Sequence, residues 1–411
     1  MTKHISPHSR RHFLASIAAT SAAAIQLDST PAASRPGPRK KLIGWGSDVA
    51  YPSKIQNNIR KIEDTLPFDG IILSNFRGKQ DGKDFTFDWE CFGRRKFDRR
   101  QIKEVVSIVK NIKFKRFTDN FLRFNVQPGN FDWFDDFSAP VHNAKMFAKV
   151  ARDVGVKGWK FDVEDYKDKL FVHKKQKHAG TKSFNEYAKQ VRERGRQIME
   201  AIQSSNPSIV LLLSLAHSYV NRQPNAHRRL DKLESYGMLP AFVNGLLDVA
   251  GPRVRLIDGQ EQAYGYLTSE DYYRGYHDAK QRALELVPRK LWPKYRSKME
   301  VGVAVFANYQ LSVPRSKAQG RHWPATYLKP EQRLQLFEQN IYNSLSSSDE
   351  YVWLYSELMG WCESGYPLPT PNGALDAIKR AKKKHDANQP LGFDLRAEVD
   401  AAKKKMKAAV Q

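Results

Sequence analysis

The sequence predicts an α/β protein of the (β/α)8-barrel class, the TIM barrel. From residue 40 onward, short apolar runs alternate with stretches whose apolar residues recur at helical spacing. Strands that alternate with helices form parallel sheets, because each helix carries the chain back across the sheet. Eight such units over about 340 residues favour a closed barrel over an open sheet. An open nucleotide-binding sheet is the alternative, but no Gly-x-Gly-x-x-Gly turn follows the first expected strand.

The expected elements follow one another along residues 41–385, which we take as the barrel domain. The expected strands are Leu42–Gly46, Asp69–Asn75, Phe121–Val126, Gly158–Val163, Val210–Leu215, Val254–Asp258, Val301–Ala307 and Tyr351–Ser356. The expected helices are Lys54–Leu66, Arg100–Ile112, Val141–Val154, Ser183–Ser204, Ser269–Leu286, Pro330–Ser344 and Gly373–Lys383, with a weaker pattern at Leu239–Asp248. The basic tail at residues 386–411 predicts a further surface helix at Arg396–Ala409.

The first 40 residues carry the pattern of an export signal followed by a spacer. Arg10 and Arg11 lie in the stretch Ser-Arg-Arg-His-Phe-Leu-Ala, and a moderately apolar run from Phe13 to Leu27 follows them. This stretch resembles the twin-arginine signal, which directs folded bacterial proteins out of the cytoplasm. The alanines at 22–24 offer a site for a signal peptidase. The resemblance predicts a periplasmic or secreted protein.

The 411-residue chain is strongly basic, with a formal net charge of +24. Such a charge attracts polyanions, yet the lysines and arginines form none of the common nucleic-acid-binding motifs. We interpret the excess first as a solvated basic surface and second as a sign of an anionic substrate, and we expect no nucleic-acid partner. No apolar run reaches about 18 residues, so a membrane-spanning helix is not expected. The two cysteines lack zinc-ligand spacing, and neither a metal nor a cofactor is expected.

The fourth expected strand carries ionisable residues on one face. Side chains alternate along a strand, so Lys160, Asp162 and Glu164 share a face, while the apolar residues between them face the helices. Three buried ionisable groups without partners would cost several kcal/mol. They are expected at a solvated mouth of the barrel, and a structural ion pair between Lys160 and Asp162 is the alternative.

The eighth expected strand follows the same alternation. Val352 and Leu354 are expected to point outward, and Trp353, Tyr355 and Glu357 inward. Aromatic rings stack on the apolar faces of pyranose rings, and a carboxylate at the strand end supplies an acceptor or a catalytic group. The alternative for Trp353 is that it fills the barrel interior.

Further side chains at the expected strand ends are candidate substrate-binding groups. They are Trp45 on the first strand and Asp48 after it, Asn125 on the third, Trp133 in the loop behind it, Asp165 after the fourth, His217 after the fifth, Asp258, Glu261 and Tyr264 at and after the sixth, and Asn308 after the seventh. Each has an ordinary structural explanation taken alone. They gather, however, at the end of the strands where barrel active sites lie.

The fourth strand also resembles, in outline, the chitinase-type motif Asp-Gly-x-Asp-x-Asp-x-Glu. Asp162 and Glu164 match its final Asp-x-Glu, in which the glutamate is the acid, while Lys157 and Lys160 replace the two earlier aspartates. The commonest retaining pattern places glutamates after strands four and seven, but here the seventh strand ends Phe-Ala-Asn-Tyr without a carboxylate. The resemblance implies a sugar-cleaving barrel of the glycoside hydrolase class and no narrower family.

Glycoside hydrolysis requires one carboxylic acid to protonate the leaving oxygen and a second carboxylate to attack the anomeric carbon or activate water. We expect Glu164 to be the acid. Asp162 and Lys160 would set its protonation, because a nearby carboxylate raises a carboxyl pKa and an ammonium lowers it. The candidates for the second carboxylate are, in order, Glu357, Glu261 and Asp258.

Other classes of function stay open at this point. A non-catalytic carbohydrate-binding barrel would keep the aromatic residues and tolerate loss of the carboxylates. A polysaccharide lyase would suit the basic charge, with Lys160, His217 or Tyr264 as the base that removes a proton beside a uronate. A metal-dependent hydrolase is less favoured, because no His-x-His falls at a strand end.

Overall fold

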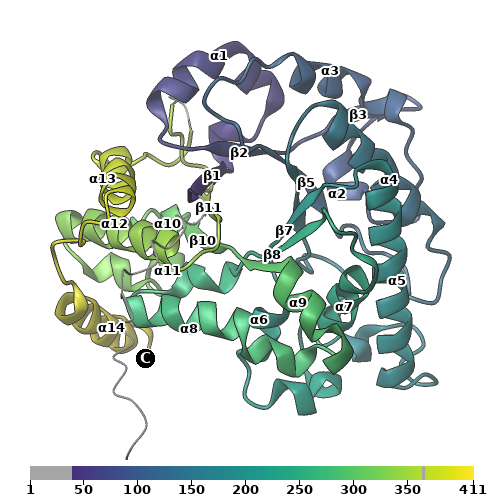
Figure 1. The fold of residues 1–411 in the computed structure, drawn as a ribbon. Helices are drawn as coiled ribbons and strands as arrows, with labels where there is room; N and C mark the ends of the chain where they lie inside the picture. Colours follow the sequence, from purple (N-terminus) through teal and green to yellow (C-terminus); the bar gives the residue numbers. More distant parts are fainter. Residues whose placement is uncertain (1–38, 363–365) are drawn as a thin grey trace, which may run out of the picture. The chain divides into compact units, whose positions relative to one another are not determined.

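A closed ring of parallel strands forms the centre of the computed structural model, which describes residues 39–362 and 366–411 (Figure 1). The ring strands are β1 (Lys41–Trp45), β2 (Gly70–Leu73), β5 (Phe121–Asn125), β6 (Gly158–Asp162), β7 (Val210–Leu213), β8 (Arg255–Asp258), β9 (Met299–Val301), β10 (Val303–Phe306) and β11 (Tyr351–Tyr355). Neighbouring strands pair in parallel in the order β10, β11, β1, β2, β5, β6, β7, β8 and β9, and the two ends of this order, β9 and β10, follow each other directly along the chain, which closes the ring.

The seventh position of the ring is shared by β9 and β10, which Gly302 separates. A Cβ atom at Gly302 would lie 2.8 Å from Cγ2 of Ile257 on the neighbouring strand, so the close approach there requires glycine. The Gly302 N–H still donates to the Asp258 carbonyl at 2.9 Å and continues the ladder. The ring therefore has eight strand positions, and the predicted (β/α)8 barrel is confirmed.

Helices cover the outside of the ring. The longer ones are α1 (Pro52–Thr65), α3 (Lys103–Asn111), α4 (Ser138–Asp153), α5 (Phe184–Ser205), α7 (Leu239–Val249), α8 (Ser269–Lys280), α12 (Pro330–Ser346), α13 (Ala374–Asp386) and α14 (Arg396–Val410). The shorter ones are α2 (Phe87–Glu90), α6 (His217–Asn221), α9 (Trp292–Lys298), α10 (Ala307–Gln310) and α11 (Lys317–Gly320). Figure 1 shows α4 and α5 on one side of the ring and α12 and α13 on the other.

The alternation of side chains along the strands divides the core into two layers, as predicted. Trp159 of β6 packs outward and stacks on Phe124 with ring centroids 4.3 Å apart. On β11, Val352 and Leu354 belong to the same outer layer. Trp353 belongs to the apolar cluster inside the ring. Lys160 and Asp162, which alternate with the outward residues, therefore face the interior.

The segment between β2 and α3 contains elements that the sequence patterns do not predict. A hairpin of β3 (Arg77–Gln80) and β4 (Lys83–Thr86) leads directly into α2. The two carboxylate oxygens of Asp88, which is fully buried, accept the N–H groups of Asn75 and Phe76 at 3.1 and 2.8 Å. These bonds fix the insertion against the end of β2.

The basic end of the chain forms the predicted helix, α14. Its inner side and the preceding residue contribute Leu395, Val399 and Ala402 to an apolar cluster with Leu267, Leu328 and Leu336. The helix is therefore packed on the barrel through this side, while most of its lysines are exposed.

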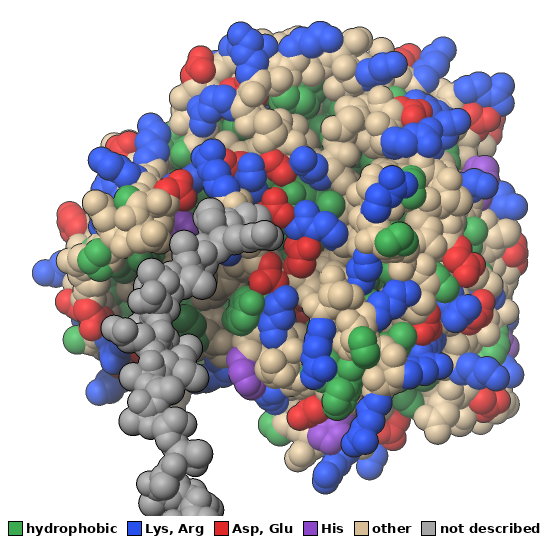
Figure 2. All heavy atoms as spheres, in the orientation of Figure 1, with side chains coloured by type: hydrophobic (Ala, Val, Ile, Leu, Met, Phe, Trp, Pro, Cys, Tyr) green, Lys and Arg blue, Asp and Glu red, His purple; other side chains and the backbone are tan. Residues whose placement is uncertain are grey.

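The charges of the chain are distributed broadly. Figure 2 shows lysine and arginine side chains scattered over the visible face, with acidic side chains among them. In the part of the chain that the structure describes, no helix is both long and apolar enough to cross a membrane. The twin-arginine stretch predicted to be an export signal lies outside the described residues.

Candidate active site

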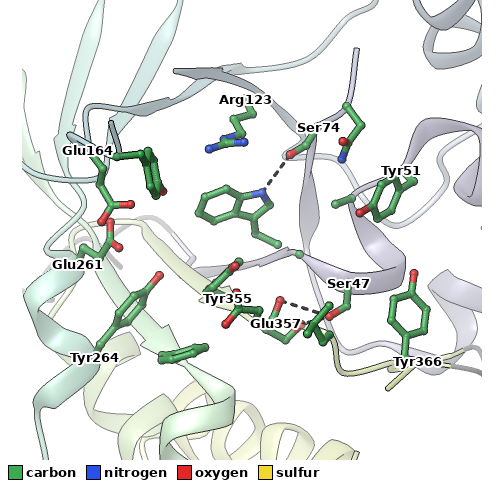
Figure 3. Close-up of a pocket in the computed structure, with 18 of the residues that line it drawn as sticks. Ser47, Tyr51, Ser74, Arg123, Glu164, Glu261, Tyr264, Tyr355, Glu357 and Tyr366 are labelled. Atoms are coloured by element: carbon green, nitrogen blue, oxygen red, sulfur yellow. Dashed lines mark hydrogen bonds between the residues drawn. The ribbon is translucent and has the colours of Figure 1, made fainter. Parts of the chain in front are cut away.

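An open cavity of about 520 Å³ lies at the carboxyl ends of the barrel strands (Figure 3). Residues at or just beyond the ends of β1, β2, β5, β6, β8, β10 and β11 line it. The lining carboxylates are Glu164, Glu261 and Glu357, and the lining tryptophans are Trp45 and Trp89. The cavity therefore lies where barrel enzymes bind their substrates.

Lys160 is buried beneath this cavity. Its side chain is fully inaccessible to solvent, and its ammonium lies 4.1 Å from the ring centre of Trp353 and 4.9 Å from that of Trp45. It donates a hydrogen bond to Ser214 Oγ. Burial lowers the pKa of Lys160, whereas the charges of Asp162 and Glu261 act in the opposite direction. Lys160 therefore lies below the site, where it is shielded from solvent and does not line the cavity.

Asp162 is the centre of a buried hydrogen-bond network. Its Oδ2 accepts Nη2 and Nε of Arg123 at 2.6 and 3.1 Å, and Nδ2 of Asn125 at 3.2 Å. The Tyr166 hydroxyl also donates to Oδ2, and Ser214 Oγ donates to Oδ1, both at 3.3 Å. Because these donors occupy its oxygens, Asp162 is placed to position its neighbours. Its charge raises the pKa of Glu164, in the direction predicted from the sequence, and Asn125 supports it through the bond to Oδ2.

Glu164 and Glu261 form a hydrogen-bonded carboxyl pair. Figure 3 shows their carboxyl groups pointing toward each other from the ends of β6 and β8. Glu261 is aimed by a sharp turn, because Gln260 has a left-handed backbone and the Glu261 N–H donates to the Ser214 carbonyl at 3.1 Å. We call Glu164 and Glu261 the carboxyl pair.

Burial and mutual repulsion change the protonation of the carboxyl pair. Burial raises the pKa of Glu164, and the charge of Asp162 raises it further. Burial also raises the pKa of Glu261 well above its usual range, with the charge of Glu164 as the second cause. Two carboxylates in contact cannot both ionise easily, so the pair gives up its last proton, which we call the shared proton, at a higher pH than an isolated glutamate does. The hydrogen bond between them lowers the pKa of Glu164 and raises that of Glu261, which favours Glu261 as the protonated partner.

Glu357, the first candidate for the second carboxylate, lines the same cavity but lies apart from the carboxyl pair. Figure 3 places it toward Ser47. Its carboxylate pairs with Nη1 of Arg315 at 3.0 Å. Its backbone is held on both sides by Asn308, whose Oδ1 accepts the Glu357 N–H at 2.8 Å and whose Nδ2 donates to the Glu357 carbonyl at 2.9 Å. Asn308, which was predicted to bind substrate, is therefore buried and holds this loop through its two hydrogen bonds to the Glu357 backbone.

The predicted aromatic residues divide into cavity walls and core. Trp45, Tyr264 and Tyr355 line the cavity as predicted. Trp353 lies below them, fully buried, and donates its indole N–H to the Gly259 carbonyl at 2.7 Å. Trp133 does not reach the cavity, because it is fully buried in the outer layer and donates to the Leu170 carbonyl at 2.8 Å. The predictions that Trp353 and Trp133 contact the substrate are corrected accordingly.

Four predicted polar ligands also serve the fold and do not line the cavity. Asp258 accepts the N–H and Oγ–H of Ser218 at 3.1 and 2.9 Å, and burial raises its pKa to about 6. His217 is fully buried with Nε2 3.1 Å from Asn244 Oδ1, and burial lowers its pKa to about 4.

The other two are carboxylates that hold loops. Asp48 accepts the Cys362 N–H at 2.6 Å. Asp165, next to Glu164, is buried under the loop that follows, and burial raises its pKa to about 7. Each of these side chains lies at or after a strand end but does not line the cavity, so the four are corrected as direct ligands.

Trp89 and Tyr166 escape the sequence predictions, whereas Arg123 shares the strand face predicted for Asn125. Arg123 shares the inner face of β5 and links Asp162 to Trp89, whose ring centre lies 3.8 Å from its guanidinium. Trp89 comes from the unpredicted insertion, and Tyr166 from the loop after β6. The signal that could have identified Trp89 is the aromatic and acidic stretch Phe-Asp-Trp-Glu at 87–90, shortly after the second expected strand.

Tyr264 offers an open hydrogen-bonding group in the cavity wall. Its hydroxyl oxygen is buried and has no hydrogen-bond partner among the described residues. Burial, and then the charge of Glu261, raise the pKa of Tyr264 well above its usual value, so the hydroxyl keeps its proton. Within the described ranges, no group of three His, Cys, Asp or Glu side chains is arranged to hold a metal ion.

Comparison with known proteins gives similarity of fold alone. No protein-family model and no curated protein matches the chain. A solved glucosidase from Croceicoccus marinus is similar with a TM-score of 0.45 and 11% identity, over 85% of this chain and 68% of that one. A mutant of xylanase A from P. fluorescens subsp. cellulosa, in complex with xylopentaose, is similar with a TM-score of 0.43 and 11% identity, over 84% of this chain and 97% of that one.

A pneumococcal exo-beta-D-N-acetylglucosaminidase is similar with a TM-score of 0.39 and 8% identity, over 91% of this chain and 98% of that one. The chain thus resembles glycoside hydrolase barrels in architecture. At such scores and identities the resemblance carries no argument about activity, which rests on the site.

Proposed function

We propose that this chain is an exported glycoside hydrolase whose acid is the carboxyl pair. The supporting observation is the pair itself, whose pKa values are raised by burial and by the neighbouring carboxyl charges at the wall of an open, aromatic cavity. A general acid needs a proton at working pH and access to the leaving oxygen, and burial with a like-charged neighbour supplies the first. The twin-arginine pattern at residues 9–15 supports export.

In the proposed reaction, Glu261 gives its proton to the glycosidic oxygen as the bond to the anomeric carbon breaks. A water molecule attacks the anomeric carbon and loses a proton, Glu261 regains a proton from solvent, and Glu164 again accepts its hydrogen bond. The buried Lys160 ammonium offsets the negative charge that remains on the carboxyl pair. The Tyr264 hydroxyl is a free donor for a sugar oxygen beside the pair.

A second carboxylate must serve the opposite face of the sugar. Carboxyl groups in hydrogen-bond contact are closer than the about 5–5.5 Å of retaining enzymes or the about 6.5–9.5 Å of inverting ones. The pair therefore acts from one side as a single acid. Glu357 is the remaining carboxylate among the described lining residues, and we assign it the activation of water.

The charge of the cavity favours a neutral sugar. Among the described residues that line it, Arg123 is the cationic one, and its guanidinium is held by Asp162. The carboxylate of an acidic sugar would therefore have no unpaired cationic side chain to bind among the described lining residues. The net charge of +24 is then a property of the outer surface.

The lyase alternative gains no support from the geometry. Lys160 and His217 are fully buried, and Tyr264 keeps its proton. A binding protein without catalysis would not need a buried carboxyl pair, whose burial is costly.

The test is turnover on soluble neutral and acidic polysaccharides, followed through new reducing ends and through ultraviolet absorbance of unsaturated products. Glu261→Gln and Glu164→Gln should each lower kcat on the best neutral substrate by about 100-fold or more. The matched control is Glu331→Gln, an exposed residue of α12, which should retain wild-type rates. Normal turnover by both pair variants, or unsaturated products, would contradict the proposal.

A further inference from the structure

Exposed large apolar side chains concentrate at the cavity. In the part of the chain that the structure describes, these are Trp89, Tyr166, Tyr273, Leu358 and Val410. Trp89, Tyr166 and Leu358 all line the one cavity that contains the carboxyl pair. Single exposed apolar residues need no explanation, but a group of them in a concave site indicates a ligand with an apolar face.

Trp89 and Tyr166 form one aromatic unit, which we call the aromatic lip. Their ring centroids are 5.3 Å apart with the planes at 63°. Trp89 is 39% exposed and Tyr166 is 48% exposed, so both rings offer surface to the cavity. They come from different segments, the insertion after β2 and the loop after β6, which meet at this point.

The aromatic lip is held rigidly from below. The Arg123 guanidinium lies 3.8 Å from the ring centre of Trp89, and the same guanidinium donates to Asp162. The Tyr166 hydroxyl donates to Asp162 at 3.3 Å and is also hydrogen-bonded to Glu164. Aromatic surface that is exposed yet fixed binds a ligand without a large loss of side-chain freedom.

We propose that the aromatic lip is a sugar subsite next to the carboxyl pair, which stacks the face of one pyranose ring of the substrate. The inference rests on the proposed function and names the residues that bind the sugar unit beside the bond that is cleaved. Pyranose faces present C–H groups to an aromatic ring and direct their hydroxyls sideways, where Glu164 and Glu261 can reach them. A purely apolar ligand would instead meet these carboxyl groups without a hydrogen-bonding group of its own.

The hydroxyl of Tyr166 connects this subsite to the acid. Because Tyr166 bonds Glu164, a ring stacked on the lip holds Tyr166 in place and keeps the carboxyl pair in its resting arrangement. Loss of the Tyr166 hydroxyl alone should therefore alter the pH profile of kcat, whereas loss of the Trp89 ring should alter binding.

The test is calorimetric titration of the full chain carrying Glu261→Gln with cellopentaose, xylopentaose, chitopentaose and pentagalacturonate. Glutamine at 261 can still donate to Glu164, so the ligand stays uncleaved while the site keeps its hydrogen bond. Adding Trp89→Ala or Tyr166→Ala should raise the Kd of the best neutral probe about tenfold or more. Trp89→Phe, which keeps a ring, should restore much of the affinity.

The matched control is Tyr273→Ala on α8, a ring 68% exposed and outside the cavity, which should bind as its parent does. Equal affinities for the Trp89→Ala and Tyr273→Ala proteins, or no binding of any probe, would overturn the subsite. Binding that depends on the lip in a protein whose wild type cleaves none of the probes would support the subsite and contradict the hydrolase proposal. A Kd that does not depend on the aromatic lip, together with cleavage that requires Glu261, would contradict the subsite and support the hydrolase proposal.

Discussion

Replacement of Asp162 by Asn tests the network beneath the carboxyl pair. Asp162 accepts two bonds from Arg123, and both side chains are almost fully buried. Removal of one partner of a buried ion pair costs about 3–5 kcal/mol, because the other charge stays buried without compensation. With an unfolding entropy of about 2.1 cal/mol/K per residue over residues 40–411, this converts to a fall in Tm of about 4–6 °C.

The same substitution should change the titration of the carboxyl pair. The charge of Asp162 raises the pKa of both Glu164 and Glu261, so its removal lowers them. The pair then loses its shared proton at a lower pH, and the alkaline limb of kcat/KM moves to lower pH. The assays are thermal unfolding by circular dichroism and the pH profile of reducing-end release. The control is Asp231→Asn at an exposed position, and an unchanged Tm with an unmoved alkaline limb would refute the reasoning.

Two other substitutions test the fold around the site. Burial lowers the pKa of His217 from 6.5 to about 4, so between these pH values the unfolded chain binds a proton that the folded state excludes. The neutral imidazole therefore contributes about 3 kcal/mol of stability above pH 6.5, and this contribution is lost as the pH falls toward 4. In denaturant titrations, the unfolding free energy of the wild type should fall as the pH is lowered between these values, and that of His217→Gln should fall less. An equal dependence on pH in the two proteins would contradict this prediction. Gly302→Ala should cost about 1–3 kcal/mol through its contact with Ile257, whereas Gly180→Ala, which meets no atom within 4 Å, should be neutral in the same titrations.

The barrel could be predicted because its signal is local. The two-residue period of a strand assigns Trp159 and Phe161 to the helices and Lys160 and Asp162 to the interior, and the structure agrees. The break at Gly302 could not be predicted in this way. It depends on the distance to Ile257 on a neighbouring strand, which no local pattern records.

The site was predictable only in part, because its contacts are between distant segments. Position at a strand end selected Glu164 and Glu261, which line the cavity, but the pairing between them depends on the left-handed turn at Gln260. The same rule also selected His217 and Asp258, which do not line the cavity. His217 bonds Asn244 and Asp258 bonds Ser218, and these partners lie on helices whose contacts cannot be read from a local sequence pattern. Trp89 was overlooked because it lies in a four-residue helix, too short to show a period.

The shared proton of the carboxyl pair can be measured without any substrate. We expect the infrared spectrum of the wild-type protein at pH 7 to contain a protonated carboxyl band that disappears in Glu261→Gln and persists in the Glu331→Gln control. The band should remain until well above the ordinary pKa of a glutamate, because burial and the adjacent Glu164 oppose ionisation. Identical spectra for the wild type and Glu261→Gln at pH 7 would show that Glu261 is ionised and would contradict the account.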